Sequence, residues 1–365
     1  MDGFGQTLYN AVQYVLSFDS TVMLPVVIFV IALFFRIKPA KAFRSALTVG
    51  IGFVGVFTIF NMLGNTIGPA AQAMVERTGL NMPAVDLGWA PLSAITWGTS
   101  IAPFCIVLTL IINIVMLAFK WTKTIDIDIW NYWHFAFAGA LVYVATDNFI
   151  LGLVAAGVAT VVIIKIADWC APLTQKYCGL PGISLPTLSS ATFFPIGLLG
   201  NWIIDKIPVI NKLHADPETI QKRFGIFGEP MMIGFILGIL IGLLAGYDFN
   251  GIVGLAINLA AVMYILPRMV RILMDGLIPI SDGVKEFMAK RFPDRTDFYI
   301  GLDIAVATGN PAIISTGLLL TPIAVLLAFI VPGNQTLPVS DLANMAVFCS
   351  MIVVACNQNI VRAVI

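Results

Sequence analysis

The chain has 365 residues, of which 59% are hydrophobic and 11% are charged, and its 20 basic residues balance its 20 acidic ones. This composition is too apolar for the water-facing surface of a soluble protein of this length, and the zero net charge excludes the electrostatic footprint of a nucleic-acid-binding protein. The 5 cysteines form neither a CxxC pair nor a metal-ligand spacing, so we expect no metal and no cofactor.

Apolar stretches follow one another along the chain. Several are shorter than the roughly 20 residues that a straight membrane crossing needs, so we expect them to use flanking residues as well. In chain order, the candidate spans are Thr21–Phe35, Ala46–Leu63, Ser100–Phe119, Tyr132–Ala145, Asn148–Ile164, Met231–Gly246, Gly251–Pro267, Ile313–Val331 and Leu342–Cys356.

The basic residues are sorted with respect to these spans. Every Lys and Arg except Arg77 lies in every second gap between spans or after the last span, beginning with Arg36. The intervening gaps contain the acidic residues Asp147 and Asp248. This is the positive-inside pattern of helical membrane proteins. We therefore predict an all-α polytopic membrane protein whose N-terminus lies on the outer, periplasmic side.

The two halves of the chain show the same order of features. In the first half, an apolar run with one acid, Val85–Gly88, precedes a long span, and a further span begins at Asp128. In the second half, Leu302–Ala305 and Asp341 occupy the corresponding places. Because the first unit contains an odd number of predicted crossings, we expect the second copy to be inverted. A chance similarity among apolar segments is the alternative.

The repeat hypothesis assigns residues 1–204 to a first inverted repeat with a re-entrant hairpin, 205–227 to a cytoplasmic linker and 228–365 to the second repeat. The second repeat has no counterpart of the span Asn148–Ile164 or of the element Gly182–Leu199. We therefore expect it to be incomplete at its C-terminus, as in a shortened version of a longer chain.

Some stretches are too interrupted by Gly and Pro to be ordinary spans, yet too apolar to be solvated loops. Broken helices at membrane depth leave backbone groups free, which is tolerated where they face a cavity. A simple interfacial loop or helix kink is the alternative. The broken stretches are Ala84–Ser100, Leu180–Gly200, Phe224–Met231 and Ile300–Ile313.

Ionisable residues inside a bilayer are costly, so they are candidates for function. Asp86, Glu229 and Asp303 qualify, and the repeat places Asp86 and Asp303 at equivalent positions. A carboxylate there accepts hydrogen bonds from the hydroxyls of a polyol. Alternatively, each acid caps the N-terminus of a half-helix.

His134 is a further candidate for the site. It follows the aromatic residues Trp130, Tyr132 and Trp133 and precedes small residues such as Ala138, which allow close approach of another element. A neutral imidazole both donates to and accepts from hydroxyl groups. A histidine near the interface that is simply hydrated is the alternative.

Seven sequence blocks together carry a resemblance that covers essentially the whole chain. They resemble the galactitol-type IIC permeases of the bacterial phosphoenolpyruvate-dependent phosphotransferase system and, more remotely, the ascorbate IIC permeases. The blocks are Gly64–Ala71 with the apolar run Val54–Leu63 before it, Val85–Trp89, Ile127–His134, Phe224–Pro230, Leu244–Asp248, Ile300–Asp303 and Val331–Gln335.

The resemblance implies a homodimeric, multi-pass permease of the bacterial inner membrane that works by an elevator-like motion. A separate IIB protein, charged by IIA, would phosphorylate the substrate, so this chain would not be an enzyme on its own. The resemblance also implies a pocket lined by Asp86, Leu87, Gly88 and Trp89, by His134 to Ala138, by the hairpin Pro186 to Leu188 and by Asp303. The family pattern has histidines where this chain has Thr187 and Asn310, so the identity of the substrate stays open.

We therefore predict a polyol or sugar permease, with galactitol or a related hexitol as substrate. The absence of a GxxxxGK[ST] motif argues against ATP hydrolysis. The alternatives are a proton-coupled polyol symporter and a non-transporting membrane sensor or scaffold. The predicted substrate-binding residues are Asp86, Leu87, Gly88, Trp89, His134, Phe137, Ala138, Thr187, Leu188, Glu229, Asp303 and Asn310.

Overall fold

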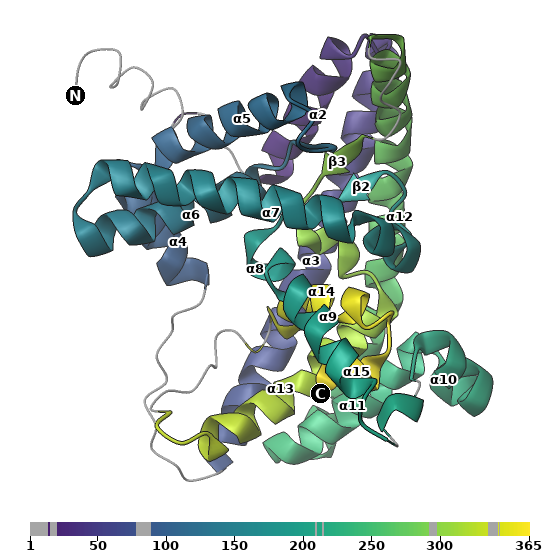
Figure 1. Cartoon of the computed structure of the whole chain (residues 1–365). Coiled ribbons are helices and arrows are strands. Elements are labelled where there is room, and N and C mark those ends of the chain that lie inside the picture. Colours follow the sequence, from purple (N-terminus) through teal and green to yellow (C-terminus); the bar gives the residue numbers. More distant parts are fainter. Residues whose placement is uncertain are drawn as a thin grey trace. The chain divides into compact units, whose positions relative to one another are not determined.

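A computed structural model describes residues 14, 20–77, 89–208, 210–213, 215–291, 298–334, 342 and 344–365 (Figure 1). The described chain is mainly helical, with three short strands. The α-helices are α2 (Ser20–Phe34), α3 (Pro39–Arg77), α4 (Trp89–Gly98), α5 (Ala102–Ala118), α6 (Ile129–Thr146), α7 (Phe149–Cys178), α8 (Leu188–Ala191), α9 (Phe193–Ile204), α10 (Pro217–Phe224), α11 (Pro230–Ala245), α12 (Phe249–Arg291), α13 (Pro311–Ile330), α14 (Met345–Ala355) and α15 (Ile360–Val364). The 3-10 helices are η1 (Ile210–Lys212), η2 (Gly225–Gly228) and η3 (Ile304–Ala307), and the strands are β1 (Thr124–Asp126), β2 (Ile183–Ser184) and β3 (Tyr299–Gly301).

Helices of membrane-spanning length and composition are present in the described chain. Four qualify outright, within α3, α7, α12 and α13, and a fifth qualifies if the bent pair Pro217–Gly228 and Pro230–Ala245 counts as one span. The predicted class, a helical protein with several membrane spans, is therefore confirmed. The side on which the N-terminus lies and the inverted repeat stay predictions.

Two of the predicted spans are much longer as helices. The stretch Gly251–Pro267 belongs to α12, which continues to Arg291, and Ala46–Leu63 belongs to α3, which continues to Arg77. In both cases the helix runs on through a polar, amphipathic segment. A hydropathy pattern marks where the apolar residues end, but backbone hydrogen bonding continues past that point.

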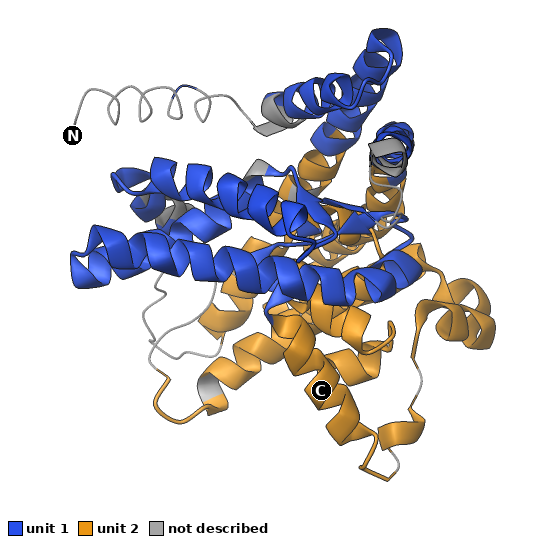
Figure 2. Ribbon diagram, turned by 45° about the horizontal axis from the view of Figure 1, so that its top comes forward, with its two compact units in different colours: residues 1–54, 92–192, 271–304 blue, residues 55–91, 193–270, 305–365 orange. Residues whose placement is uncertain are grey.

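The chain divides into two compact units, each assembled from separate stretches of sequence (Figure 2). Unit 1 comprises residues 1–54, 92–192 and 271–304, and unit 2 comprises residues 55–91, 193–270 and 305–365. Both α3 and α12 contribute to both units, α3 beginning in unit 1 and α12 in unit 2.

Unit 1 contains a small parallel sheet that the sequence analysis did not predict. Its strand order is β1-β3-β2. Ile300 of β3 pairs with Ile125 on one side and Ile183 on the other, and Gly301 pairs with Asp126 and Ser184. A Cβ atom at Gly301 would lie 2.8 Å from the Cα of Asp126, so glycine allows the close approach of β1.

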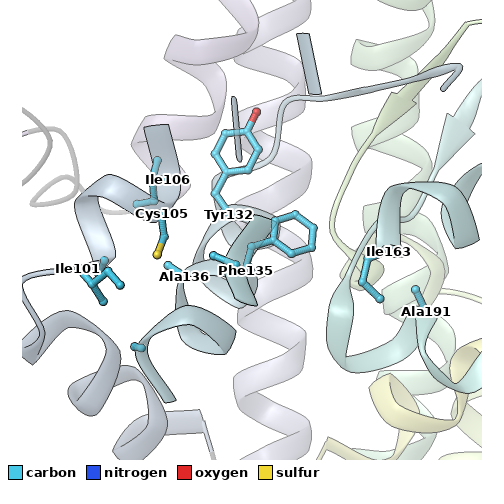
Figure 3. Close-up of a cluster of buried hydrophobic side chains, with 11 residues drawn as sticks. Ile101, Cys105, Ile106, Tyr132, Phe135, Ala136, Ile163 and Ala191 are labelled. Carbon is cyan, nitrogen blue, oxygen red and sulfur yellow. The ribbon is translucent and has the colours of Figure 1, made fainter. Parts of the chain in front are cut away.

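The helices of unit 1 pack around a buried apolar cluster between α5, α6 and α7 (Figure 3). Gly139 and Gly152 let α6 and α7 approach closely, since a Cβ at Gly139 would lie 2.9 Å from the carbonyl oxygen of Gly152. The hydroxyls of Thr109 and Thr160, 3.1 Å apart, link α5 to α7. This packing fixes the N-terminal end of α6, where the polar residues of unit 1 gather. The cluster includes Ile101, Cys105, Ile106, Tyr132, Phe135, Ala136, Ile163 and Ala191.

In unit 2, hydrogen bonds from arginine side chains fix helix ends. The guanidinium of Arg362 donates to Asn201 Oδ1 and Asp205 Oδ1, both at 2.7 Å. Arg77, the one basic residue outside the alternate gaps, donates to the carbonyl oxygens of Leu243 and Leu244, each at 2.9 Å. These carbonyls lie in the last turn of α11, where Leu243 O also accepts the backbone N–H of Gly246 at 3.1 Å. A structural role thus accounts for the exception of Arg77 to the charge pattern.

Candidate functional site

The carboxyl ends of β1, β3 and β2 meet at one edge of the sheet because the three strands are parallel. Each strand is followed within a few residues by a polar side chain. β1 ends in Asp126 and leads to Asp128, β2 leads to Thr187, and β3 leads to Asp303. Polar groups distant in sequence are thereby brought together, as at the ligand-binding edge of other parallel sheets.

Asp128 connects this edge to α6. It is the N-cap of α6, and its side chain accepts a hydrogen bond from the backbone N–H of Trp130 at 3.1 Å. Its second oxygen accepts the backbone N–H of Asp303 at 3.0 Å. A fully buried carboxylate therefore holds both the start of α6 and the segment after β3.

Thr187 connects the same segment to the hairpin. Its hydroxyl accepts the backbone N–H of Ile304 at 2.8 Å. The hydroxyl proton has two acceptors within reach, Asn131 Oδ1 at 2.9 Å and Asp303 Oδ2 at 3.3 Å. Asn131 and Thr187 are fully buried, and Asp303 is 8% exposed. Asp303 is thus held at two points: Asp128 accepts its backbone N–H, and the hydroxyl of Thr187 lies within hydrogen-bond distance of its carboxylate.

Asp126 adds a second carboxyl group on the side of β1. Its Oδ1 accepts from Asn131 Nδ2 at 2.9 Å, and its backbone groups bond to Asn113 and to the hydroxyl of Tyr132. Its Oδ2 is buried and has no hydrogen-bond partner in the described part of the chain. This oxygen can accept a hydrogen bond from a ligand.

His134 lies one turn into α6, buried to 3% exposure. Its Nδ1 lies 2.8 Å from the carbonyl oxygen of Trp130. Because a carbonyl only accepts, Nδ1 carries the proton, and Nε2 is the acceptor of the neutral ring. The ring interacts electrostatically with Asp303. We call Asp126, Asp128, Asn131, His134, Thr187 and Asp303 the polar cluster; all of them belong to unit 1.

The other predicted residues of unit 1 lie beside this cluster. Phe137 stacks on Trp133 with ring centroids 5.9 Å apart, and Ala138 follows it on α6; both are half-buried. Leu188 begins α8 and packs against the apolar cluster of Figure 3. These residues provide apolar surface next to the acceptors of the polar cluster.

The remaining predicted residues belong to other parts of the chain, and their place in the site stays a prediction. Asp86, Leu87 and Gly88 lie outside the described residues, so the predicted meeting of Asp86 and Asp303 is untested, and Trp89 begins α4. Glu229 and Asn310 belong to unit 2. Glu229 occupies the N-cap position of α11, and Asn310 caps α13 by accepting the N–H of Ala312 at 2.9 Å. For Asn310, the structure therefore gives a capping role.

Sequence reasoning missed Asp126, Asp128 and Asn131 as members of the cluster. All three fall in or next to the block Ile127–His134, from which only His134 was selected. The available signal was the alternation of two acids with isoleucines directly before a helix start, since buried acids at such a place need partners. The partner of Asp128 is a backbone N–H 175 residues away in sequence, which no local pattern reveals.

Comparison with known proteins gives a family match over nearly the whole chain. Residues 14–365 match the model of a family described as the PTS system sugar-specific permease component. The PTS system galactitol-specific EIIC components of Escherichia coli strains K12 and O157:H7 are each 39% identical over 356 residues, which cover 98% of this chain and 79% of theirs. A putative permease IIC component of Escherichia coli K12 is 40% identical over 353 residues, covering 97% of this chain and 80% of that protein.

Proposed function

The chain belongs to the family of sugar-specific permease components of the phosphotransferase system, and on that premise we propose that it carries a hexitol, galactitol or a close relative, across the bacterial inner membrane. The similarity to galactitol-specific EIIC components supports the choice of a sugar alcohol. We further propose that it works as a homodimer, as the resemblance to its family implies. We also propose that its N-terminus lies on the periplasmic side, because the distribution of its basic residues favours that orientation.

The observation that carries the proposal is the convergence of hydrogen-bond acceptors in the polar cluster. A hexitol is uncharged and has a hydroxyl on every carbon, so it needs several acceptors and some apolar surface for its carbon chain. Asp303, the free Oδ2 of Asp126 and Nε2 of His134 supply acceptors, and Phe137 and Leu188 supply apolar surface. Hydrogen bonds to carboxylates are about twice as strong as neutral ones.

Within this proposal the residues of the cluster have different roles. Asp128 and Thr187 position Asp303, because they hold its backbone and its side chain. Asp303, Asp126 and His134 contact the substrate. Thr187 replaces a histidine of the galactitol pattern and keeps hydrogen-bonding ability without titrating, which supports a substrate related to galactitol while leaving room for another hexitol.

Membership of this family supports a proposal for coupling to phosphorylation. We propose that a core domain bearing the polar cluster moves across the membrane, after which a separate IIB protein, charged by IIA, phosphorylates the substrate on the cytoplasmic side. The phosphorylated product no longer fits a cluster rich in carboxylates, so it does not return. A ligand shifts a conformational equilibrium only through its different affinity for the two states, and phosphorylation supplies that difference here.

The proposal is tested by hexitol binding to the detergent-solubilised protein, measured by calorimetry with hexitols, pentitols and ascorbate. We expect galactitol or a related hexitol to bind, and Asp303→Asn to raise the dissociation constant roughly tenfold to hundredfold, since hydrogen bonds to charged groups contribute about 1.5–3 kcal/mol. Asp147→Asn, an exposed acid at the end of α6, is the matched control and should bind like the wild type. Absence of binding by every polyol would support the sensor or scaffold instead.

One observation favours a second candidate, a proton-coupled polyol symporter. Asp126, Asp128 and Asp303 share one buried cluster, and neighbouring buried carboxyl groups resist simultaneous ionisation. The two functions differ in their energy source. Uptake into membrane vesicles that requires IIA and IIB supports the permease, whereas uptake that survives without them and collapses with the proton gradient supports the symporter.

A further inference from the structure

Two cavities in unit 1 are distinct from the polar cluster, which meets them at one residue, Asp126, in the lining of the second. The first, of about 860 Å³, is bordered by the link between α2 and α3 and by the last part of α12. The second, of about 770 Å³, lies between α2, α5 and α12. Phe35 and Phe287 border both cavities, and their rings meet edge to face with centroids 5.3 Å apart. The cavities therefore adjoin each other across this pair of rings.

The first cavity is cationic. Arg36, Lys38 and Lys41 border it with exposed side chains, and none of them forms an ion pair with another described residue. Glu286 is the acidic residue in its lining. Three positive charges against one negative charge favour an anionic ligand.

The second cavity is mainly apolar. Val27 and Ile31 of α2 face Ile114 and Leu117 of α5 across it. Asn113, Asp126 and Tyr132 also border it, but they are hydrogen-bonded to one another: Asp126 N–H donates to Asn113 Oδ1 at 3.1 Å, and the Tyr132 hydroxyl donates to Asp126 O at 2.6 Å. Such a lining suits a hydrocarbon chain better than a polyol.

The helix ends beside these cavities carry cations where glycine is the usual residue. Arg36 has φ +59° and follows α2 in a Schellman motif, with the N–H of Ile37 bonded to Ala32 O and that of Arg36 to Leu33 O, both at 2.9 Å. Lys120, with φ +63°, occupies the same position after α5 and borders the second cavity.

Elsewhere the described chain has either glycine or an uncharged or acidic residue at positive φ after a helix: Asp147 after α6 has φ +50°, and Asn357 and Gln358 after α14 have φ +56° and +64°. Gly179 after α7 and Gly246 after α11 have φ +67° and +74°. A side chain with Cβ is disfavoured at positive φ. Arg36 and Lys120 are thus kept at a conformational cost beside the two cavities, which points to a use for their charges.

We propose that the two cavities together bind one anionic glycerophospholipid, such as a phosphatidylglycerol. Its phosphate lies among Arg36, Lys38 and Lys41, and an acyl chain enters the apolar cavity past Phe35 and Phe287. Lys120 adds a further positive charge near the second cavity. The positive-inside pattern puts these cations at the cytoplasmic leaflet, where basic pockets between helices hold anionic head groups. The inference uses the proposed membrane placement of the chain but not the identity of its substrate.

A free phosphate would account for the cations but not for the adjoining apolar cavity. A neutral phospholipid would account for the apolar cavity but not for the cations. The phosphorylated IIB protein is a further anionic partner on that side, but a folded protein has no acyl chain that could fill the apolar cavity between α2 and α5. The occupant that uses both cavities is therefore the lipid.

The test is thermal unfolding of the delipidated 365-residue chain in detergent, with palmitoyl-oleoyl phosphatidylglycerol, palmitoyl-oleoyl phosphatidylcholine or inorganic phosphate added. We expect phosphatidylglycerol to raise the midpoint by roughly 2 °C, as specific binding at about ten times Kd would, and the other two additions to have little effect. Equal shifts with phosphatidylcholine or with phosphate, or no shift with phosphatidylglycerol, would overturn the proposal.

Separate variants test the contributions of the cationic cavity and of the apolar cavity to lipid binding. Arg36→Gly combined with Lys38→Gln should keep the fold, because glycine suits the positive φ, and should lose most of the phosphatidylglycerol shift. Ala118→Trp, which places an indole in the apolar cavity, should also lose it. The matched control, Lys222→Gln with Arg223→Gln on the exposed α10, removes two cations elsewhere and should keep the full shift.

An unchanged shift in the Arg36 and Lys38 double variant would refute the lipid site. If that variant also lost transport with IIA and IIB, the cations would instead be a docking surface for the phosphoryl donor. Hexitol binding, measured separately by calorimetry, distinguishes failure of the lipid site from failure of the proposed transport function.

Discussion

Replacing Thr187 by valine removes one hydroxyl from the polar cluster and leaves its shape almost unchanged. The backbone N–H of Ile304, which donates to this hydroxyl at 2.8 Å, would lose its acceptor in a fully buried place. An unsatisfied buried donor costs about 1–3 kcal/mol, so we expect a loss of roughly 2 kcal/mol in the free energy of unfolding. The side chain of Asp303 would also lose a donor at 3.3 Å.

The effect on binding follows from the freed carboxylate. Without the hydroxyl, Asp303 Oδ2 is no longer held in place, and we expect the dissociation constant for the hexitol to rise about tenfold, which corresponds to 1.4 kcal/mol. Thr187→Ser keeps the hydroxyl and serves as the control; it should bind the hexitol with nearly wild-type affinity. Stability is measured by thermal unfolding and affinity by calorimetry on the same samples.

Two results would refute this reasoning. If Thr187→Val melted and bound like the wild type, the hydroxyl would not hold the segment after β3. If Thr187→Ser were as damaging as Thr187→Val, the lost methyl group rather than the hydroxyl would matter, and Thr187 would be a packing residue.

Three further predictions concern the surroundings of the cluster. Asp128→Ala leaves the N–H groups of Trp130 and Asp303 without acceptors and should destabilise the protein by roughly 2–5 kcal/mol. Hexitol affinity should be lost as well. Weakened binding at an unchanged melting temperature would contradict the positioning role of Asp128. Gly301→Ala brings a methyl group within 2.8 Å of the Asp126 backbone and should lower the melting temperature more than Gly254→Ala, whose Cβ meets nothing within 4 Å. Arg77→Gln removes two hydrogen bonds at the end of α11 and should cost about 1 kcal/mol in thermal unfolding, while hexitol affinity in calorimetry stays unchanged.

The class of the protein could be predicted from the sequence because membrane insertion acts on local features. Spans and their flanking charges are read along the chain, so the sorting of Lys and Arg was sufficient, and helices long and apolar enough to span a membrane confirm the class. Part of the polar cluster could be predicted as well. Asp303 and His134 were selected because ionisable groups within apolar sequence are costly, and the structure brings both into the cluster.

The sheet could not be predicted because its strands have two or three residues each. Periodicity needs more residues than that to be recognised. Their pairing joins segments near positions 125, 183 and 300, and this pairing brings Asp128 to the backbone of Asp303. The division into two interleaved units has the same origin, since it depends on contacts between distant segments.

The hydrogen bonds of the polar cluster bear on the proposed elevator motion. Every described bond among Asp126, Asp128, Asn131, Thr187 and the segment after β3 joins two residues of unit 1. A body that carries its substrate across a membrane must keep its binding groups in place while it moves, because their loss in transit would cost the affinity that they supply. The small sheet meets this requirement, since it fixes the three strand ends within one unit. A cysteine pair joining β1 to β3 would then leave transport intact under oxidising conditions, and a block of transport by such a cross-link would show that these segments separate during the cycle.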